Sequence, residues 1–249
     1  MTNDSIPLLP PPPSLSQRCA LFLDVDGTLV DFAAHPERVS VRAGLVQRLA
    51  QLADERDGAL VLVSGRRIEW LDRLFAPLQL AAAGLHGLQR RRAGEPLPAP
   101  ADPPAALREV LGQATALLQA YPQAHVEDKG EAIALHWRAM PDAAADLQAF
   151  AIQALARLPG YRLQPGDHVV ELRPRQADKG MAIAAFLDEA PCAGRVPVFV
   201  GDDLTDEHGF EVVNARGGAS ILVGDRSGSA ATHRLPDVAS VHAWLGVKA

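Results

Sequence analysis

The sequence has few cysteines, few aromatic residues and no excess of positive charge. Its 249 residues include only two cysteines, Cys19 and Cys192. Two thiols exclude a disulfide-stapled scaffold and a cysteine-rich zinc site, and they are typical of a protein from the reducing cytoplasm. The net charge of −6 excludes the broad basic surface of a nucleic-acid-binding protein. No apolar run approaches membrane-spanning length, so we expect a cytoplasmic protein without a nucleic-acid or membrane partner.

Two proline-rich stretches divide the chain. Residues 1–17 lack the basic start and apolar core of a secretory signal, and they contain the run Pro10 to Pro13. We expect them to form a flexible arm. The second stretch, Glu95 to Pro104, has the composition of a linker. We therefore expect core segments over 18–95 and 175–249, with an inserted domain over 96–174.

The two core segments alternate short apolar runs with apolar stripes of helical spacing. Such an alternation predicts an α/β fold of Rossmann type, in which helices cover both faces of a parallel sheet. The runs that predict buried strands are Ala20–Leu23, Ala59–Val63, Leu80–Gly84, Val196–Val200 and Ser220–Val223. The predicted helices cover 41–53 and 68–75, a segment after Gly180, and a last segment that includes Val238 and Leu245.

The inserted domain has a different order, which is helix, strand, strand, helix, strand, strand. Its helices are expected over 107–121 and 147–158, and its strands over 125–129, 133–138, 161–164 and 168–173, with Pro165–Asp167 as a hairpin turn. This order predicts a small antiparallel sheet that carries both helices on one face. Polar side chains on the other face could meet a ligand, although the pattern by itself favours an ordinary solvated face.

Two carboxylates follow the first predicted strand. Asp24 and Asp26 are succeeded by Gly27, which allows a turn, and by the hydroxyl of Thr28. Ligands of open α/β sheets bind beyond the carboxyl ends of the strands. Two close carboxylates repel one another unless a cation or a proton lies between them, and Mg²⁺ prefers oxygen ligands of this kind. The alternative is an Asx-type turn without chemistry.

Three further polar clusters stand at predicted strand ends or helix starts. Ser64 and Gly65 end the second strand, where a hydroxyl and backbone amides suit a phosphate group, although Ser64 is equally well explained as a helix N-cap. Lys179 precedes a helix, and an acidic run that contains Asp202 follows a later strand. Each has an ordinary explanation alone, but together they predict a cation site beside a phosphate site.

The ordered motifs DVDGT from Asp24, SGR from Ser64, DKG from Asp178 and GDDLTDE from Gly201 resemble the haloacid dehalogenase superfamily of aspartyl-phosphate phosphatases. The longer stretches AGLHGL, VEDKGEAIALHWR, ELRPRQADKG and VFVGDDLTDE resemble, more narrowly, the family of trehalose-6-phosphate phosphatases. The resemblance implies a Rossmann-like core with an inserted α+β cap domain of the C2 type. It also implies Mg²⁺-dependent hydrolysis of trehalose 6-phosphate, the last step of trehalose biosynthesis, by a protein that we expect to be monomeric.

The resemblance assigns a role to each cluster. Asp24 is the nucleophile, and Asp26 protonates the leaving sugar oxygen and then activates water. The Mg²⁺ ligands are the Asp24 carboxylate, the Asp26 carbonyl and Asp202. The resemblance assigns phosphate binding to Thr28, Ser64, Gly65 and Lys179, and it assigns support of the metal site to Asp203 and Asp206. The residues assigned to sugar binding are Glu127, Lys129, Arg138, Glu171 and His86, and the weaker candidates are His136 and Arg66.

Three other functions remain open at this point. The substrate could be sucrose phosphate or a hexose phosphate. A receiver-type signalling domain also gathers carboxylates, a hydroxyl and a lysine around Mg²⁺, but it needs neither the insertion nor Asp26. An inactive sugar sensor is expected to have lost Asp24 or Asp26, and both are present.

Overall fold

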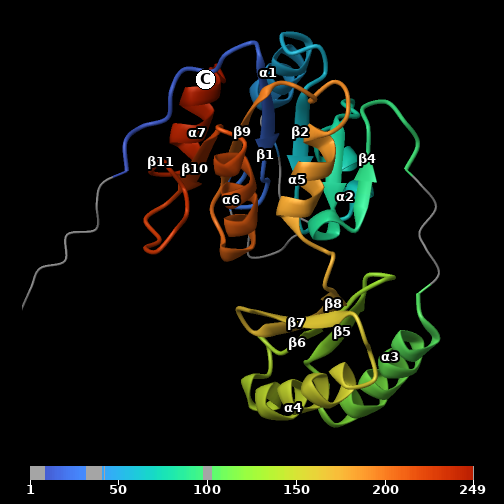
Figure 1. Cartoon of the computed structure of the whole chain (residues 1–249). Coiled ribbons are helices and arrows are strands. Elements are labelled where there is room, and N and C mark those ends of the chain that lie inside the picture. The colour runs from blue at the N-terminus through green and yellow to red at the C-terminus, as the bar shows by residue number, and fades with distance from the viewer. Residues whose placement is uncertain (1–8, 32–40, 42, 98–102, 249) are drawn as a thin grey trace, which may run out of the picture. The chain divides into compact units, whose positions relative to one another are not determined.

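The computed structural model describes residues 9–31, 41, 43–97 and 103–248. The chain divides into two compact units (Figure 1). The core unit comprises Met1–Pro98 and Asp178–Ala249, and the inserted unit comprises Ala99–Ala177. Among the described residues, no helix combines the length and the apolar character that crossing a membrane requires.

A seven-stranded sheet with the order β11-β10-β9-β1-β2-β3-β4 forms the centre of the core unit. Its strands are β1 Cys19–Leu23, β2 Leu60–Val63, β3 Ala81–Gly84, β4 Gln89–Arg91, β9 Val196–Gly201, β10 Ala219–Val223 and β11 His233–Leu235. Every strand pair is parallel except β3–β4. The chain runs outward from β1 in one direction and from β9 in the other, so the strand order reverses between these two neighbours. Sheets of this kind bind ligands at such a point.

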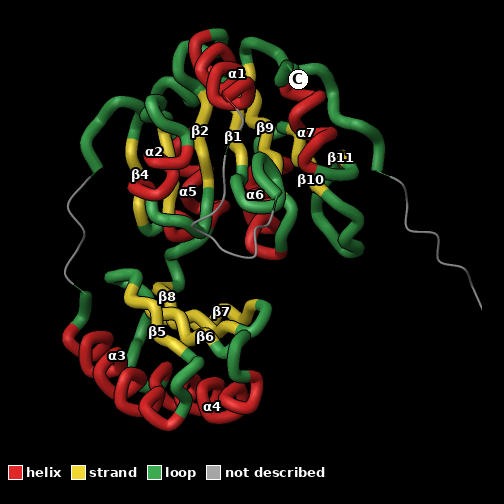
Figure 2. The backbone as a smooth tube through the Cα atoms, turned by 180° about the vertical axis from the view of Figure 1, so that it is seen from behind, coloured by secondary structure: helices red, strands yellow, loops and turns green. Residues whose placement is uncertain are grey.

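Helices cover both faces of this sheet, as Figures 1 and 2 show. They are α1 Ala43–Asp54, α2 Ile68–Leu74, α5 Lys179–Leu187, α6 Glu207–Ala215 and α7 Val238–Leu245. One apolar cluster joins Leu21 of β1 to Leu45 and Val241, which places α1 and α7 on one face. A second cluster joins Phe22 to Ile183 of α5 and Phe210 of α6 on the opposite face. Because β1 is buried on both sides, all five of its residues are apolar.

The inserted unit contains a four-stranded antiparallel sheet with the order β5-β6-β8-β7. Its elements are α3 Ala105–Leu117, β5 His125–Asp128, β6 Ile133–His136, α4 Ala144–Leu155, β7 Tyr161–Gly166 and β8 Val169–Pro174. Leu135 and Leu172 pack against Leu107 of α3 and Leu147 of α4, so both helices lie on one face. The register places Glu127, Ala134 and Glu171 in one row across neighbouring strands, and within this unit that row lies on the face without helices.

The predicted fold class is confirmed, and the core unit contains two strands and an α-helix that the sequence did not predict. These are the strands β4 and β11 and the helix α6. The predicted hairpin is present, but its turn lies at residues 167–168 rather than at Pro165–Asp167. β7 continues through Gly166, β8 begins at Val169, and His168 turns the chain with a φ of 58°. Pro165 is tolerated because β7 is an edge strand, where a missing N–H breaks no ladder.

The basic cluster Arg90–Arg92 is solvated only in part, because Arg92 is exposed while Arg91 is buried. Arg91 is only 5% exposed. Its Nη2 donates to Asp72 Oδ1 at 2.7 Å and to the carbonyl of Leu80 at 3.0 Å. Because β4 alternates its side chains between two faces, the central arginine of the cluster faces inward and needs these acceptors. Arg90 and Arg92 share Glu189, and their hydrogen bonds lower its pKa to about 2.

The described part of the N-terminal arm is extended and in contact with the core unit. The backbone N–H of Arg234 in β11 donates to the carbonyl of Pro10 at 3.0 Å. The indole of Trp244 donates to the carbonyl of Pro13 at 2.9 Å, and Leu15 packs on the apolar cluster. Residues 9–17 are therefore anchored rather than free, while residues 1–8 lie outside the described residues.

Candidate active site

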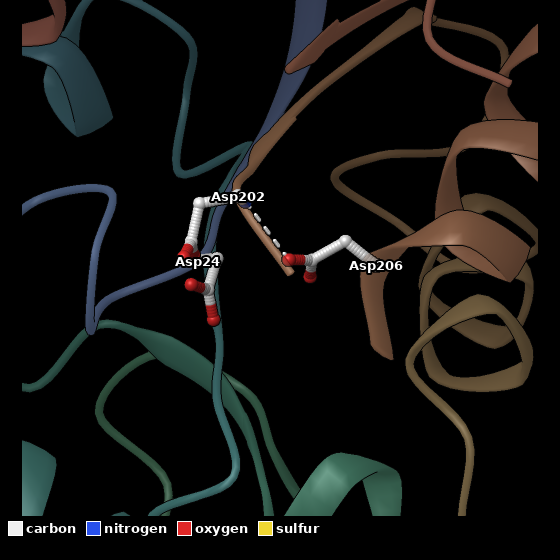
Figure 3. A group of neighbouring side chains, drawn as sticks. All are labelled: Asp24, Asp202 and Asp206. Carbon is white, nitrogen blue, oxygen red and sulfur yellow. Dashed lines mark hydrogen bonds between the residues drawn. The ribbon is translucent and has the colours of Figure 1, made fainter. Parts of the chain in front are cut away.

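The polar clusters meet where three parallel strands end side by side. Asp24 follows β1, Ser64 follows β2 and Asp202 follows β9, and β1 pairs with both of the other strands. Figure 3 shows the carboxylates of Asp24 and Asp202 close together, with Asp206 turned toward the backbone of Asp202. Residues that are almost 180 positions apart in the sequence are thus brought to one end of one sheet.

Lys179 connects two of the acidic groups. Its Nζ donates to Asp24 Oδ1 and to Asp206 Oδ1, each at 2.7 Å, and its side chain is only 3% exposed. Burial disfavours the ammonium form, but the charges of Asp206 and Asp24 outweigh that effect and raise the pKa of Lys179. Lys179 is therefore a permanent cation at the centre of the site.

One ammonium group does not balance the carboxylates around it. Burial raises the pKa of Asp24 well above its ordinary value, Lys179 opposes this, and the charges of Asp206 and Asp202 add to it. Burial and the charge of Asp206 likewise raise the pKa of Asp202 to about 6. The site consequently favours any additional positive charge that reaches these carboxylates.

Asp206 holds the Asp202 loop and Lys179 in place. Its Oδ2 accepts the backbone N–H groups of Asp202 and Asp203, each at 3.0 Å, and its Oδ1 accepts Lys179. The side chain is fully buried. Gly201 leaves the necessary space, because a Cβ there would lie 2.4 Å from the Asp206 carboxyl carbon. Asp206 thus fixes the loop that carries Asp202 and also orients Lys179.

The donor set fits a divalent cation that prefers oxygen ligands. Carboxylate oxygens of Asp24, Asp202 and Asp206 all lie within 4.8 Å of one another. Both oxygens of Asp206 are already engaged by N–H donors, so Asp24 and Asp202 are the better ligands. The hydroxyl of Thr28 donates to Asp202 Oδ1 at 3.3 Å and thereby orients one of them. Mg²⁺, which needs few protein carboxylates and keeps several waters, suits such a site.

The raised pKa values predict a link between pH, Mg²⁺ and stability. Because folding favours the neutral forms of Asp24 and Asp202, both carboxyl groups contribute stability at low pH. The contribution of Asp202 is lost as the pH rises through about 6, and that of Asp24 is lost in the same direction. Saturating Mg²⁺ should reverse that loss, at about 2.7 kcal/mol for a concentration of 100 times Kd. We expect Mg²⁺ to raise Tm by about 5–10 °C at pH 8 and by much less at pH 5.

Thermal unfolding in EDTA and in MgCl₂ at both pH values checks this expectation. Asp202→Asn should abolish most of the Mg²⁺ effect. Asp225→Asn, which makes the same chemical change at an exposed position, should retain it. An equal rise of Tm at pH 5 and pH 8 would show that the cation binds elsewhere.

Asp26 is paired with an arginine. Arg66 Nε donates to Asp26 Oδ2 at 2.9 Å, and Arg66 Nη2 donates to Asp26 Oδ1 at 2.8 Å. Arg66 was only a weak candidate for lining the pocket, and the structure gives it a direct contact with the predicted acid/base group. The sequence offers no signal for this contact beyond the position of Arg66 at the end of a strand.

The loop after β2 is tightly built. Ser64 is buried, and its Oγ accepts the backbone N–H of Arg66 at 3.1 Å. The N-cap of α2 is Arg67, so the alternative explanation of Ser64 as the helix N-cap is wrong. His86 lies against Gly65, where a Cβ would come within 2.7 Å of its Nε2. His86 has a φ of 55°, and strain of this kind is concentrated at functional sites.

Two of the expected sugar-binding residues form an ion pair in the inserted unit. Lys129 Nζ donates to Glu171 Oε2 at 2.9 Å, and their side chains are 12% and 10% exposed. Glu127 Oε2 lies 3.1 Å from Nε2 of His136. The His136 ring in turn stacks on His125 with a centroid distance of 4.5 Å. These groups therefore share the face that carries no helix.

Three other candidates have different partners or belong to the other unit. Arg138 is exposed and pairs with Asp167 at the β7–β8 turn, at 2.7 Å. His86 belongs to the core unit. Asp203 accepts the backbone N–H of Leu204 at 2.6 Å and caps the short helix Leu204–Asp206.

Asp178 is a supporting residue of the site to which the sequence analysis gave no role. Asp178 is the N-cap of α5, and its Oδ1 accepts the N–H groups of Gly180 and Met181 at 2.7 and 3.2 Å. Nδ1 of His208 also contacts this oxygen. The bond network fixes the first turn of α5 and with it the backbone of Lys179. An aspartate directly before a predicted helix is an N-cap signal, so its position in the sequence could have identified it.

Comparisons with known proteins agree with this geometry. The family model for trehalose-phosphatase matches residues 22–239. The chain is 43% identical over 233 residues to the trehalose-6-phosphate phosphatase of Escherichia coli strain K12, covering 94% of this chain and 87% of that protein. It is 42% identical over 206 residues to a probable trehalose-phosphate phosphatase of Sinorhizobium fredii, covering 82% and 77% of the two proteins.

Solved structures show the same fold. A trehalose-6-phosphate phosphatase related protein matches with a TM-score of 0.69 at 24% identity, over 91% of this chain and 95% of that chain. The C-terminal domain of the Candida albicans trehalose-6-phosphate phosphatase matches with a TM-score of 0.77 at 18% identity, over 98% and 100%. A phosphatase of the haloalkanoate superfamily from Bacteroides thetaiotaomicron matches at 0.62 and 15% identity, over 95% and 98%.

Proposed function

The chain belongs to the trehalose-phosphatase family of phosphatases, and on that premise we propose that it hydrolyses trehalose 6-phosphate through a phosphorylated Asp24. The observation that carries this mechanism is the group of buried Asp24, buried Lys179 and partly buried Asp202 at the strand-order reversal. Trehalose 6-phosphate as the substrate is supported by the relatives' names together with the polar face of the inserted unit. In this role the enzyme completes trehalose biosynthesis.

In the first step, an oxygen of Asp24 attacks phosphorus and forms a P–O bond. The bond between phosphorus and the sugar oxygen breaks, its electron pair stays on the sugar oxygen, and that oxygen takes a proton from the carboxyl group of Asp26. Lys179 and the loop of Ser64 and Gly65 hold the phosphoryl oxygens, with Thr28 beside them. The buried ammonium of Lys179 supports this assignment, because it offsets the repulsion between a carboxylate and a phosphate dianion.

In the second step, water attacks the phosphorus of the aspartyl phosphate and gives one proton to the Asp26 carboxylate. The P–O bond to Asp24 breaks, and its electron pair returns to the Asp24 carboxylate. The products are trehalose and phosphate, and Asp26 has regained the proton that it lost. Asp24 and Asp26 follow the same strand end, as two groups that serve one phosphoryl group must.

We assign Mg²⁺ to the carboxylates of Asp24 and Asp202 and to the backbone carbonyl of Asp26. Asp206 and Asp203 support the site by fixing the Asp202 loop. When bound, Mg²⁺ supplies charge stabilisation of several kcal/mol to the transferring phosphoryl group. The remaining chemistry uses the chain's own side chains.

A panel of sugar phosphates tests the substrate. We expect trehalose 6-phosphate to give the highest kcat/KM, ahead of sucrose phosphate and hexose phosphates, and activity to disappear in EDTA. If a hexose phosphate gave the highest kcat/KM instead, the same mechanism would apply to that substrate. A protein that stays phosphorylated, without turnover, would indicate a receiver-type signalling domain instead.

We also propose that the inserted unit selects the disaccharide. Glu127, Lys129 and Glu171 present charged hydrogen-bonding groups on one face, and many hydroxyls are best bound by such groups. Arg138 and His86 are further contacts in this proposal. Lys129→Ala should lower kcat/KM for trehalose 6-phosphate by about 10²-fold, in line with a lost charge-assisted hydrogen bond of about 2–3 kcal/mol. The effect on a small aryl phosphate should stay below about threefold.

Steady-state kinetics with both substrates measures this selectivity. Glu127→Ala should likewise lower kcat/KM for trehalose 6-phosphate much more than kcat/KM for the small aryl phosphate. Gln153→Ala, an exposed substitution on α4, serves as the control and should change neither rate. Equal losses on both substrates would contradict disaccharide recognition by this face.

We propose in addition that the protein works as a cytoplasmic monomer on a small-molecule substrate, without a nucleic-acid or membrane partner. Two buried free cysteines, Cys19 and Cys192, support a reducing compartment. Light scattering coupled to size exclusion tests the monomer, for which a mass of 26.5 kDa is expected.

A further inference from the structure

We propose that Arg66 is a positioning residue that fixes the direction of the Asp26 carboxylate for the second step, the hydrolysis of the aspartyl phosphate. The inference rests on the proposed function, because it needs Asp26 as the group that accepts a proton from water. It assigns a task to a side chain that the phosphoryl-transfer steps above do not use.

The two side chains form a bidentate pair, which we call the fork. Arg66 uses Nε and Nη2 to reach both oxygens of Asp26, at 2.9 and 2.8 Å. A bidentate guanidinium–carboxylate pair restricts the carboxylate plane as well as its position. Both side chains are only partly buried, so packing alone would leave Asp26 several rotamers.

Arg66 is itself fixed both at its side chain and at its backbone carbonyl. Its guanidinium lies 4.3 Å from the centroid of the Trp70 ring in α2, an arrangement that is attractive for an arginine on an indole. Its carbonyl accepts the N–H of Leu85 at 2.9 Å. Gly84 leaves room for this approach, since a Cβ there would lie 2.8 Å from that carbonyl oxygen. An arginine held in this way presents a fork of fixed direction.

Arg66 also connects the acid/base group to the predicted phosphate loop. Its backbone N–H donates to Ser64 Oγ at 3.1 Å, while its side chain holds Asp26. One residue therefore sets the position of Asp26 relative to the loop that is assigned to the phosphoryl group. In the second step the attacking water must lie between phosphorus and the Asp26 carboxylate, so this relative position decides how well the proton is removed.

The predicted effect falls on one step of the reaction. During hydrolysis of the aspartyl phosphate, an oxygen of Asp26 must point toward the attacking water, and the two hydrogen bonds from Arg66 fix the direction of that carboxylate. Loss of the fork should slow this step by about 10²-fold, as expected for a misplaced general base. Attack of Asp24 on an aryl phosphate needs little proton donation, because the leaving group is good. Formation of the intermediate from that substrate should therefore remain fast.

Rapid-quench kinetics of Arg66→Met with p-nitrophenyl phosphate and Mg²⁺ tests the proposal. We expect kcat to fall about 10²-fold while kcat/KM, which reports enzyme phosphorylation, changes by less than about threefold. We also expect a burst of nitrophenol close to one equivalent per active site, together with acid-stable phosphoprotein. Arg66→Lys keeps the charge without the fork and should show the same burst with a loss of about tenfold.

Arg73→Met is the matched control. It removes an exposed arginine from α2, the helix that follows the Arg66 loop, and should behave as the wild type. An equal fall in kcat and kcat/KM without a burst, in either Arg66 variant that remains folded by circular dichroism, would overturn the positioning role. If Asp26→Asn accumulates phosphoprotein and the Arg66 variants do not, this inference fails and the proposed function stands. If no variant and no wild-type sample is ever phosphorylated, the proposed function fails.

Discussion

Asp24→Asn is expected to abolish turnover while the protein stays folded. An amide oxygen is too weak a nucleophile to attack phosphorus, so kcat should fall by at least about 10⁴-fold, the scale on which removal of a nucleophile acts. Stability should be unchanged or higher. The buried carboxylate of Asp24 has a raised pKa, which means that folding disfavours its charge, and the neutral amide removes that cost.

Phosphate release measures the expected loss of turnover, and thermal unfolding measures the expected stability. Asp54→Asn makes the same chemical change at an exposed end of α1 and should alter neither quantity. Near-normal phosphate release by Asp24→Asn would refute the assignment of the nucleophile. A lower Tm would show instead that the ionised carboxylate stabilises the folded protein.

Lys179→Met should cost the most stability of any single change at the site. Its removal leaves Asp24 and Asp206 buried without the ammonium that contacts both at 2.7 Å. Breaking a buried pair in this way costs about 3–5 kcal/mol of unfolding free energy. The loss should grow as the pH rises, because the pKa of Asp24 is already raised and lower pH protonates it. Activity should fall at least about 10³-fold, since the phosphoryl group loses its lysine.

Urea unfolding at pH 5 and pH 8, combined with phosphate release, checks this expectation. The double variant Lys179→Met with Asp206→Asn should regain much of the stability and none of the activity, because an amide oxygen still accepts the two backbone N–H groups. Lys248→Met, at an exposed position, is the control. A single variant as stable as the wild type at pH 8 would mean that water or another cation replaces the ammonium.

The sequence was sufficient to predict those parts of the fold that depend on continuous apolar runs and ordered motifs. β1 is a case in point: its residues are apolar because both faces are buried, and Asp24 follows directly. The same logic located Ser64 and Asp202, because strand ends of a parallel sheet share one edge. The sequence alone therefore predicts that Asp24, Lys179 and Asp202 lie in one group.

Other features depend on partners that no local pattern reveals. β4 contains Gln89, Arg90 and Arg91, a composition that does not predict a strand; its arginines are paired with acids from α2 and from the end of α5. The fork from Arg66 to Asp26 is of the same kind, since it joins side chains 40 positions apart. Thr28 was assigned to phosphate binding, and in the structure its hydroxyl contacts Asp202. Such pairings follow from the tertiary arrangement alone.

The anchored segment at the start of the chain has a consequence for self-association. β11 is an outer strand of the core sheet, and an open outer strand is a template on which another polypeptide can add. Here the carbonyl of Pro10 already accepts the N–H of Arg234. The run Pro10 to Pro13 has no N–H groups of its own, so it offers no donors to a further strand. The segment thus covers the edge of β11 and prevents a strand of another molecule from pairing with it.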